Sequence, residues 1–172
     1  YGTTLAGLMK NHNVKPREFL DYVHNIDVSS LKKDLKLQKI LKFLPGNKYI
    51  YTNGSKSHAI NVMKKLGINN YITKIFDIEN ANYIPKPSMI SLKYFMKKFN
   101  IKAEEAIFFE DIPKNLINPK KAGFQTVLIK NNSHPDNNTD ILDKEKLQHD
   151  FVDHISFDIT ASLEQIYLDI NN

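Results

Sequence analysis

Residues 48–67 read KYIYTNGSKSHAINVMKKLG, and this stretch decides the fold class. The run 48–52 is rich in residues that favour strands, and it ends at Asn53-Gly54, which is typical of a turn. A helix is predicted from about Lys56 to Leu66, and Gly67 is placed to end it. A strand followed closely by a helix is the repeating unit of an α/β fold.

The same alternation continues toward the C-terminus. Further strands are predicted over 75–78, 106–109, 125–129 and, at an edge, 155–157, with helices over 88–98, from Asp111 to about Lys121, and over 162–170. The polar stretch 131–150 has no period and is predicted to be a loop. We therefore predict a doubly wound parallel sheet, a Rossmann-like core, with helices on both faces. The part from Leu5 to Lys42 is helical in pattern throughout, which indicates a separate helical layer or cap.

Composition excludes several classes of protein. The 172 residues fit one domain, and a hydrophobic content of 41% is enough to build a core. Without cysteine there are no disulfides or thiolate metal sites, which suits a reducing, cytoplasmic compartment. No apolar run approaches the roughly 20 residues that span a bilayer, and no signal peptide opens the chain. The net charge of +5 comes from lysines scattered among acids, so we expect no nucleic-acid partner and no membrane partner.

Three polar groups stand at or near predicted strand ends, where doubly wound sheets bind their ligands. The first is Thr52-Asn53-Gly54, which offers a hydroxyl and backbone N–H groups just before a helix. Such a position can bind phosphate. An ordinary strand-turn-helix connection with a capping threonine explains the same residues.

The second polar group is Lys86, which lies between Pro85 and Pro87 immediately before a predicted helix. The two prolines restrict the backbone on both sides and so restrict the direction of the lysine. A cation held in this way can neutralise phosphoryl charge. The alternative is a solvated lysine in a stiff loop.

The third polar group is the acidic pair Glu110-Asp111, which follows the apolar run 106–109, with Asn115 four residues later. Hard oxygen ligands at a strand end suit Mg²⁺, which keeps several waters and uses few protein carboxylates. The alternative is a helix N-cap at Asp111 with Glu110 in solvent.

The threonine, the lysine and the acidic pair occur in an order that resembles motifs II, III and IV of the haloacid dehalogenase superfamily. The resemblance is strongest to its pyrimidine 5′-nucleotidase branch and covers nearly the whole chain. The matching stretches are YGTTL at 1–5, VHNID at 23–27, LPG at 44–46, TNG at 52–54 with His58-Ala59, PKP at 85–87 and FEDIPKNL at 109–116. Each short motif is weakly specific, whereas the ordered set is strongly so.

The resemblance implies a role for each matching residue. Thr52, with the backbone of Asn53 and Gly54, would bind the transferring phosphoryl group, and Lys86 would bridge that group and the nucleophile. Asp111 would bind Mg²⁺ directly, and Glu110 would order metal-bound water. Residues 1–44 would be the C-terminal part of a helical cap, and residues 45–172 a haloacid dehalogenase-like α/β core that lacks its first strand. Asn115 stands where many members carry a further acid, which leaves its metal role open.

The family's first motif, Asp-x-Asp-x-Thr after a strand, does not occur in the sequence. Asp136-Asn-Asn-Thr139 lies in a polar stretch, and Asp27-Val-Ser-Ser30 follows no strand. Because the chain begins at Tyr1 rather than Met, we expect this motif upstream, and we expect the 172 residues alone to be inactive and less stable than a chain that includes it.

The resemblance implies a Mg²⁺-dependent phosphomonoester hydrolase that works through an aspartyl-phosphate, on a small-molecule substrate such as a pyrimidine nucleoside 5′-monophosphate. The alternative is a catalytically inactive phosphate-binding or interaction protein of the same fold. His24 and His58 could approach a substrate, but we expect both to be structural histidines.

Overall fold

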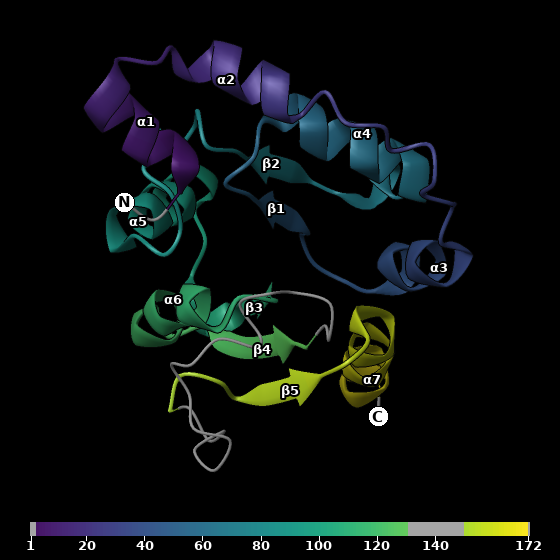
Figure 1. Cartoon of the computed structure of the whole chain (residues 1–172). Coiled ribbons are helices and arrows are strands. Elements are labelled where there is room, and N and C mark those ends of the chain that lie inside the picture. The colour runs from purple at the N-terminus through teal and green to yellow at the C-terminus, as the bar shows by residue number, and fades with distance from the viewer. Residues whose placement is uncertain (1–2, 131–149, 172) are drawn as a thin grey trace. The chain divides into compact units, whose positions relative to one another are not determined.

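A computed structural model describes residues 3–130 and 150–171 (Figure 1). The chain forms two compact units, the first made of Tyr1–Lys86 with Leu163–Asn172 and the second of Pro87–Ser162. Helices and parallel strands alternate in both units. No helix among the described residues is long and apolar enough to cross a membrane.

The first unit begins with helices and continues with a strand-helix-strand arrangement. Its elements are α1 (Thr4–His12), α2 (Pro16–Val23), α3 (Leu35–Phe43), β1 (Tyr49–Tyr51), α4 (Lys56–Leu66), the 3₁₀ turn η1 (Asn69–Tyr71) and β2 (Lys74–Phe76). Strands β1 and β2 are parallel, with Tyr51 opposite Phe76, and α4 is the crossover that parallel strands require. Phe76 is fully buried, and the Tyr51 ring meets it edge-on at a centroid distance of 5.2 Å.

Short-range signals set the ends of α4. The Ser55 hydroxyl accepts the N–H of His58 at 3.3 Å and caps the start of the helix. Gly67 ends the helix in the left-handed conformation, with φ of 75°, which residues other than glycine adopt only with strain. Helix α3 packs on this end, because the Leu66 carbonyl accepts both the N–H of Asp34 at 3.1 Å and Nε2 of Gln38 at 3.0 Å.

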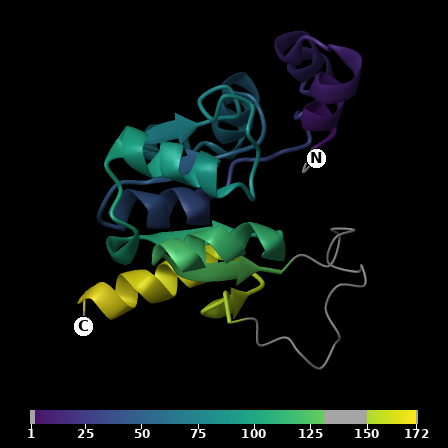
Figure 2. The ribbon, with the colours of Figure 1, turned by 90° about the vertical axis from the view of Figure 1, so that its left-hand side faces the viewer.

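The first two helices form a separate packing group within this unit. Leu5 of α1 and Leu20 of α2 are buried together with Ile78, which follows β2. Met9, Phe19 and Tyr83 pack against the same cluster. Figure 2 shows α1 and α2 together and apart from α3. The assignment of residues 1–44 to a cap and 45–172 to a core stays a prediction.

The second unit holds a three-stranded parallel sheet with the order β3-β4-β5 (Figures 1 and 2). Its strands are covered by short helical segments and by α5, and α7 begins in this unit and ends in the first. The elements are α5 (Met89–Phe99), η2 (Ala103–Glu105), β3 (Ile107–Glu110), η3 (Pro113–Leu116), α6 (Ile117–Ala122), β4 (Gln125–Ile129), β5 (His154–Ser156) and α7 (Ile159–Asn171).

The core of the second unit is mainly apolar, and hydrogen bonds hold its buried Thr126 in place. Val127 and Leu128 of β4 are buried, and Phe108 and Phe124 meet edge to face at 5.6 Å. The fully buried Thr126 contacts Asp153, whose carboxylate accepts the Thr126 N–H at 2.8 Å. Every buried polar atom of this contact is therefore paired within the fold, as burial requires.

The predicted α/β fold with parallel strands is confirmed, and two elements differ in detail. The strand predicted over 75–78 ends at Phe76, because the Asp77 carboxylate accepts the N–H groups of Lys56 at 3.1 Å and Asn80 at 3.0 Å and turns the chain. The helix predicted after Asp111 is divided into η3 and α6. Pro119 has no N–H to donate to the carbonyl of Asn115, and it lies in the first turn of α6, where an intrahelical bond from that position is not needed. Of the loop predicted over 131–150, residues 131–149 lie outside the described residues.

Candidate active site

The Thr52–Gly54 loop connects β1 to α4 at the carboxyl edge of the first unit's sheet. Thr52 Oγ1 accepts the Gly54 N–H at 2.9 Å. The Thr52 N–H donates to the carbonyl of Phe76 at 2.9 Å, and the Gly54 carbonyl accepts the Ile78 N–H at 3.2 Å. Both ends of the loop are therefore held by the chain at the end of β2, and its shape is set before any ligand arrives.

The side chain of Asn53 holds Lys86 beside this loop. Asn53 Oδ1 accepts the Lys86 N–H at 2.7 Å, and Nδ2 donates to the Lys86 carbonyl at 3.3 Å. The Lys86 ammonium donates to the Tyr51 carbonyl at 3.1 Å and lies 5.4 Å from the centroid of the Tyr51 ring. Lys86 and Thr52 are thus brought to the same end of β1. The sequence predicted a role for the Asn53 backbone and missed this use of its side chain, which no local pattern signals.

The turn before Lys86 is strained and is stabilised by packing. Asn82 and Tyr83 both adopt left-handed backbone conformations, with φ of 51° and 60°. Asparagine tolerates this conformation, whereas tyrosine does so rarely. The Tyr83 N–H donates to the Ile78 carbonyl at 2.8 Å, and its ring packs on the cluster formed by α1 and α2. The first two helices therefore support the turn that leads into Pro85-Lys86-Pro87.

Two histidines lie next to the same loop. His24 follows α2, His58 belongs to α4, and their rings stack at a centroid distance of 4.6 Å with 14° between the planes. His24 Nδ1 lies 2.9 Å from the Ser55 hydroxyl oxygen. Burial lowers the pKa of His24, the neighbouring His58 lowers it further, and Asp21 opposes both effects. The stack and the contact with Ser55 agree with the expected structural role, but they also place His24 against the predicted phosphate loop.

The acidic pair lies at the end of β3 in the second unit. Glu110 is buried, and its Oε1 accepts the N–H groups of Asp111 at 3.2 Å and Ile112 at 3.3 Å. Glu110 therefore shapes the turn that presents Asp111, which is half-buried. The resemblance implied that Glu110 orders metal-bound water and gave no role in shaping the turn; the alternative, with Glu110 in solvent, is wrong because Glu110 is buried.

The donor set of this loop fits Mg²⁺. Asn115, in η3, is buried, and within the described part of the chain its Oδ1 has no hydrogen-bond partner. A buried amide oxygen without a partner is unusual, and a water or a cation at this position would satisfy it. Asp111 and Asn115 would supply one carboxylate and one amide oxygen, the hard donors that Mg²⁺ prefers. Among the described residues no group of three or more His, Cys, Asp and Glu side chains could hold a metal, so a softer, histidine-rich site is not formed there.

Comparison with known families settles the affiliation of the chain. The family model described as haloacid dehalogenase-like hydrolase matches residues 3–129. The chain belongs to this family. Among curated protein sequences, none matches the chain significantly.

Solved structures show the haloacid dehalogenase-like fold as well. A hydrolase of this family from Deinococcus radiodurans, with bound phosphate and sodium, aligns over 97% of this chain and 74% of that chain, with a TM-score of 0.63 and 17% identity. An L-2-haloacid dehalogenase aligns over 96% of this chain and 70% of that chain, with a TM-score of 0.62 and 14% identity. A second such dehalogenase, from Xanthobacter autotrophicus, aligns over 54% of this chain with a TM-score of 0.48 and 17% identity, and the chain spans only 38% of its length.

Membership of the haloacid dehalogenase-like hydrolases confirms the superfamily resemblance, whereas the pyrimidine 5′-nucleotidase branch stays a prediction. The structure places Thr52, Asn53, Gly54 and Lys86 together in the first unit. Asp111 and Glu110 belong to the second unit, so their meeting with the other site residues stays a prediction. The chemical roles of all six residues are likewise proposals.

Proposed function

We propose that this haloacid dehalogenase-like hydrolase is a Mg²⁺-dependent phosphomonoester hydrolase whose substrate is a nucleoside 5′-monophosphate, with a pyrimidine base. The observation that carries the proposal is the Asn53 side chain, which holds Lys86 at the end of β1 next to Thr52. A hydroxyl, an ammonium and the start of an eleven-residue helix then lie together, which is a suitable arrangement for binding a phosphoryl dianion.

Each residue of the first unit has a distinct part in this proposal. The Thr52 oxygen accepts the Gly54 N–H, so its own proton remains for donation to a phosphoryl oxygen. The Lys86 ammonium offsets the charge of the phosphoryl group, and this effect is strongest in the transition state, where charge is redistributed among the oxygens. The Asn53 side chain holds Lys86 in place before the reaction, so no free energy is needed to reorient the lysine in the transition state.

The metal would be held by Asp111 and Asn115, with Glu110 fixing the shape of their loop. When bound, Mg²⁺ would neutralise phosphoryl charge and orient the group for in-line displacement. Displacement of halide from a haloacid involves no phosphate for such a cation to neutralise, but transfer of a phosphoryl dianion to a carboxylate does need the cation, because like charges must approach each other.

The proposal requires a carboxylate nucleophile. An aspartate would attack phosphorus and expel the nucleoside, and water would then hydrolyse the aspartyl-phosphate. Residues 1–172 contain no Asp-x-Asp motif to supply it, so the proposal concerns the protein with the residues upstream of Tyr1.

Dehalogenation of 2-haloacids is the competing reaction, because an L-2-haloacid dehalogenase shares the fold. Displacement of halide from carbon leaves no phosphoryl dianion to neutralise, and a metal-binding loop would have no part in it. The buried, unpartnered Asn115 oxygen beside an acidic pair therefore favours phosphoryl transfer over dehalogenation.

The test is an assay of phosphate release by the full-length protein. Nucleoside 5′-monophosphates and p-nitrophenyl phosphate are offered with Mg²⁺ or with EDTA, and 2-chloropropionate is offered in parallel with halide release as the readout. We expect Mg²⁺-dependent phosphate release and no halide release.

The substitution Lys86→Ala should lower turnover on the order of a hundredfold, by loss of a preorganised charge-stabilising group. The exposed Lys39, on α3, provides the matched control Lys39→Ala, which should leave turnover unchanged.

Two results would contradict the proposal. Halide release without phosphate release would identify a dehalogenase. Binding of phosphate without turnover of any phosphomonoester would identify a binding protein of the same fold.

A further inference from the structure

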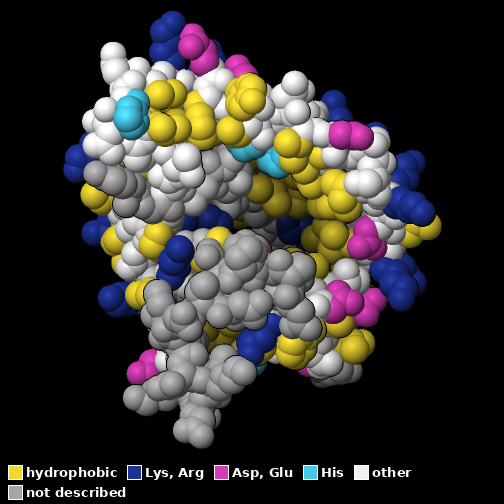
Figure 3. Space-filling view, viewed as in Figure 1, with side chains coloured by type: hydrophobic (Ala, Val, Ile, Leu, Met, Phe, Trp, Pro, Cys, Tyr) yellow, Lys and Arg dark blue, Asp and Glu magenta, His cyan; other side chains and the backbone are white. Residues whose placement is uncertain are grey.

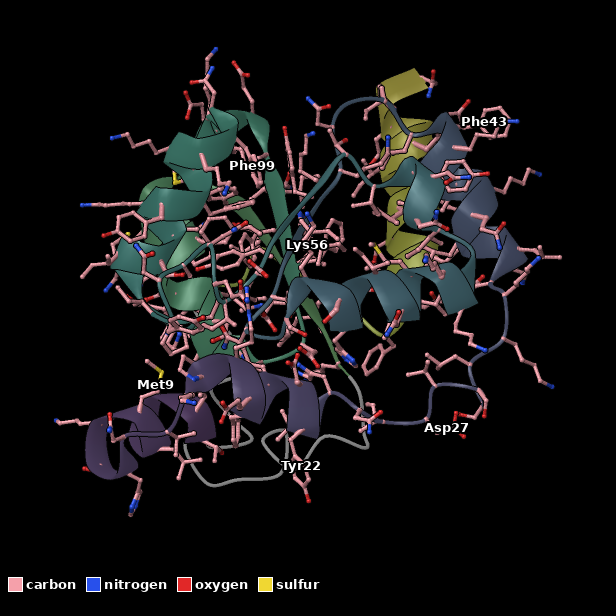
Figure 4. All side chains as sticks on the ribbon, turned by 90° about the horizontal axis from the view of Figure 1, so that it is seen from above. Met9, Tyr22, Asp27, Phe43, Lys56 and Phe99 are labelled. Atoms are coloured by element: carbon pink, nitrogen blue, oxygen red, sulfur yellow. The ribbon has the colours of Figure 1, made fainter. Side chains whose placement is uncertain are left out.

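His24 reaches the Thr52–Gly54 loop from a distant part of the first unit. It follows α2, yet its Nδ1 lies 2.9 Å from the hydroxyl of Ser55, the residue that caps α4. The ring also stacks on His58, at 4.6 Å between centroids. These two contacts fix both the position and the plane of the imidazole, because one holds an edge and the other holds a face. Figures 1 and 4 show the corresponding approach of α2 to α4.

The opposite edge of the His24 ring faces the space beside Gly54. A Cβ atom placed on Gly54 would lie 3.3 Å from His24 Nε2 and 3.3 Å from Thr52 Oγ1. The imidazole nitrogen and the threonine hydroxyl therefore border the same small space, which the lack of a side chain at Gly54 keeps open. Within the described part of the chain, the hydrogen bond of His24 runs through Nδ1 and none runs through Nε2.

The hydrogen bonds around Ser55 allow His24 Nε2 to be a donor. The Ser55 oxygen accepts the His58 N–H, so the Ser55 hydroxyl proton remains for donation to His24 Nδ1. A neutral imidazole that accepts at Nδ1 carries its hydrogen on Nε2, and a protonated imidazole carries hydrogens on both nitrogens. Ser57, whose hydroxyl lies 3.1 Å from that of Ser55, can donate in that contact and does not compete for the proton.

We propose that His24 is a substrate-contacting residue whose Nε2–H donates to a phosphoryl oxygen bound beside Gly54, opposite the Thr52 hydroxyl. This inference rests on the proposed phosphate site and adds a contact from the helical N-terminal part of the chain. Ser55 and His58 are then positioning residues, because they orient the ring without touching the ligand.

The proposed contact with phosphate should change the pKa of His24. The titratable and charged groups that act on it are His58 from α4 and Asp21 from α2. Burial lowers the pKa of the free imidazole first, and His58 lowers it further. A bound phosphate dianion stabilises the imidazolium, so binding must raise the pKa of His24 and take up protons.

The experiment measures binding of inorganic phosphate by calorimetry, with the full-length protein and three variants. His24→Asn keeps an amide near Nδ1 and removes the group at Nε2, whereas His24→Gln places an amide near Nε2. His12→Asn removes an exposed histidine of α1 and is the matched control. We expect His24→Asn to weaken phosphate binding by about tenfold, as for a lost hydrogen bond to a charged group. His24→Gln should recover most of that affinity, and His12→Asn should bind like the parent.

A second measurement does not depend on any variant being folded. The imidazole C–H signals of the parent protein are titrated by NMR with and without phosphate. The midpoint of His24 should rise on adding phosphate, while the midpoint of His12 should not move.

The outcomes separate this inference from the proposed function. If the parent binds phosphate and Lys86→Ala weakens that binding, but His24→Asn and the His24 midpoint show no effect, His24 is structural and the inference is wrong. If the parent does not bind phosphate at all, the proposed function fails and the inference fails with it.

Discussion

Asn53 shows how one amide can organise a site without touching the substrate. Its two polar atoms pair with the N–H and the carbonyl of Lys86, a residue 33 positions away in the sequence. A hydrogen bond of this kind contributes only about 1 kcal/mol to stability. Its larger effect is geometric, since it keeps the Lys86 ammonium at the Tyr51 carbonyl, next to Thr52.

Gly54 allows a direct test of the space that Thr52 and His24 border. Gly54→Ala would place a methyl group 3.3 Å from Thr52 Oγ1 and from His24 Nε2, where a phosphoryl oxygen is expected. We expect phosphate binding to weaken by about tenfold or more, equivalent to at least 1.4 kcal/mol, because the methyl occupies the ligand's position. Calorimetry measures the affinity, and a urea titration confirms that folding is intact. The control is Gly46→Ala, because nothing lies within 4 Å of a Cβ at Gly46, and it should leave phosphate binding unaffected. If Gly54→Ala binds phosphate like the parent, the ligand lies elsewhere.

Among the helices, α3 and α4 meet at a junction that depends on Gly67. The residue ends α4 with φ of 75°, and a Cβ there would lie 2.5 Å from Gln38 Nε2, which donates to the Leu66 carbonyl. Any side chain at this position would therefore displace Gln38 and break the bond that holds α3.

Gly67→Ala should accordingly cost more stability than the comparable change at Gly46. Gly46 also has a left-handed backbone, with φ of 78°, but nothing lies within 4 Å of a Cβ there. We expect Gly46→Ala to lower the free energy of unfolding by about 1 kcal/mol from backbone strain alone. Gly67→Ala should lower it by about 1–2 kcal/mol more, through the displaced hydrogen bond and the clash. Urea unfolding measures both. In a Gln38→Ala background, where the clash and the hydrogen bond are both already absent, Gly67→Ala should cost no more than Gly46→Ala; equal losses at the two glycines in the parent would contradict the clash.

Asp153, which directly precedes β5, forms an ion pair with Lys120 of α6, and the contribution of this pair to stability depends on pH. Lys120 lowers the pKa of Asp153 below its ordinary value of 3.8, and the N–H of Thr126 lowers it further. A carboxylate whose pKa is lower in the folded state stabilises the fold above its unfolded pKa, and this contribution is lost as the pH falls through the folded pKa.

Asp153→Asn should therefore destabilise the protein at neutral pH and have a smaller effect in acid. The Asn side chain keeps the size of Asp153 but loses the ion pair with Lys120 and the charge that the Thr126 N–H favours. Urea midpoints of the parent and the variant, measured at about pH 7 and about pH 3, test this expectation. The difference between them should shrink in acid; a difference that is constant with pH would show that the ionisation of Asp153 does not contribute.

Along the whole sequence, lysines and arginines are scattered among aspartates and glutamates. On the face shown in Figure 3, Lys and Arg side chains are spread out with Asp and Glu among them rather than gathered in one patch. On that face, the Lys and Arg side chains that give the net charge of +5 form no basic patch of the kind that binds nucleic acid. A small anionic substrate needs only a local positive group, and Lys86 supplies one.

The proposed metal requirement concerns the protein as a whole. In the full-length protein, Asp111→Asn should raise the Mg²⁺ concentration for half-maximal phosphatase activity by about tenfold or more, because a neutral amide is a weaker ligand than a carboxylate. Steady-state phosphate release over a range of Mg²⁺ concentrations measures this. Asp150→Asn, at an exposed position, is the control, and an unchanged Mg²⁺ dependence in Asp111→Asn would remove Asp111 from the metal site.

Several features of this protein follow from short stretches of sequence. The strand predicted over 48–52, observed as Tyr49–Tyr51, and the glycine that ends α4 are confirmed, because strand propensity and left-handed glycine act over a few residues. The cap at Ser55 was not predicted. The alternation of such elements also predicted parallel pairing, since parallel strands need a crossover connection and a helix between them supplies it. The ordered motifs identified the superfamily, and the match over residues 3–129 confirms it.

Contacts between distant residues were decided only by the tertiary structure. A role was predicted for the Asn53 backbone and none for its side chain, whose bonds to Lys86 exist because the chain returns past the end of β1 after β2 and a strained turn. His24 was expected to be structural, yet the packing of α1 and α2 on Ile78 carries it to Ser55, 31 residues away. Local propensities cannot signal such pairs, because a hydrogen bond between remote residues depends on the path of the whole chain between them.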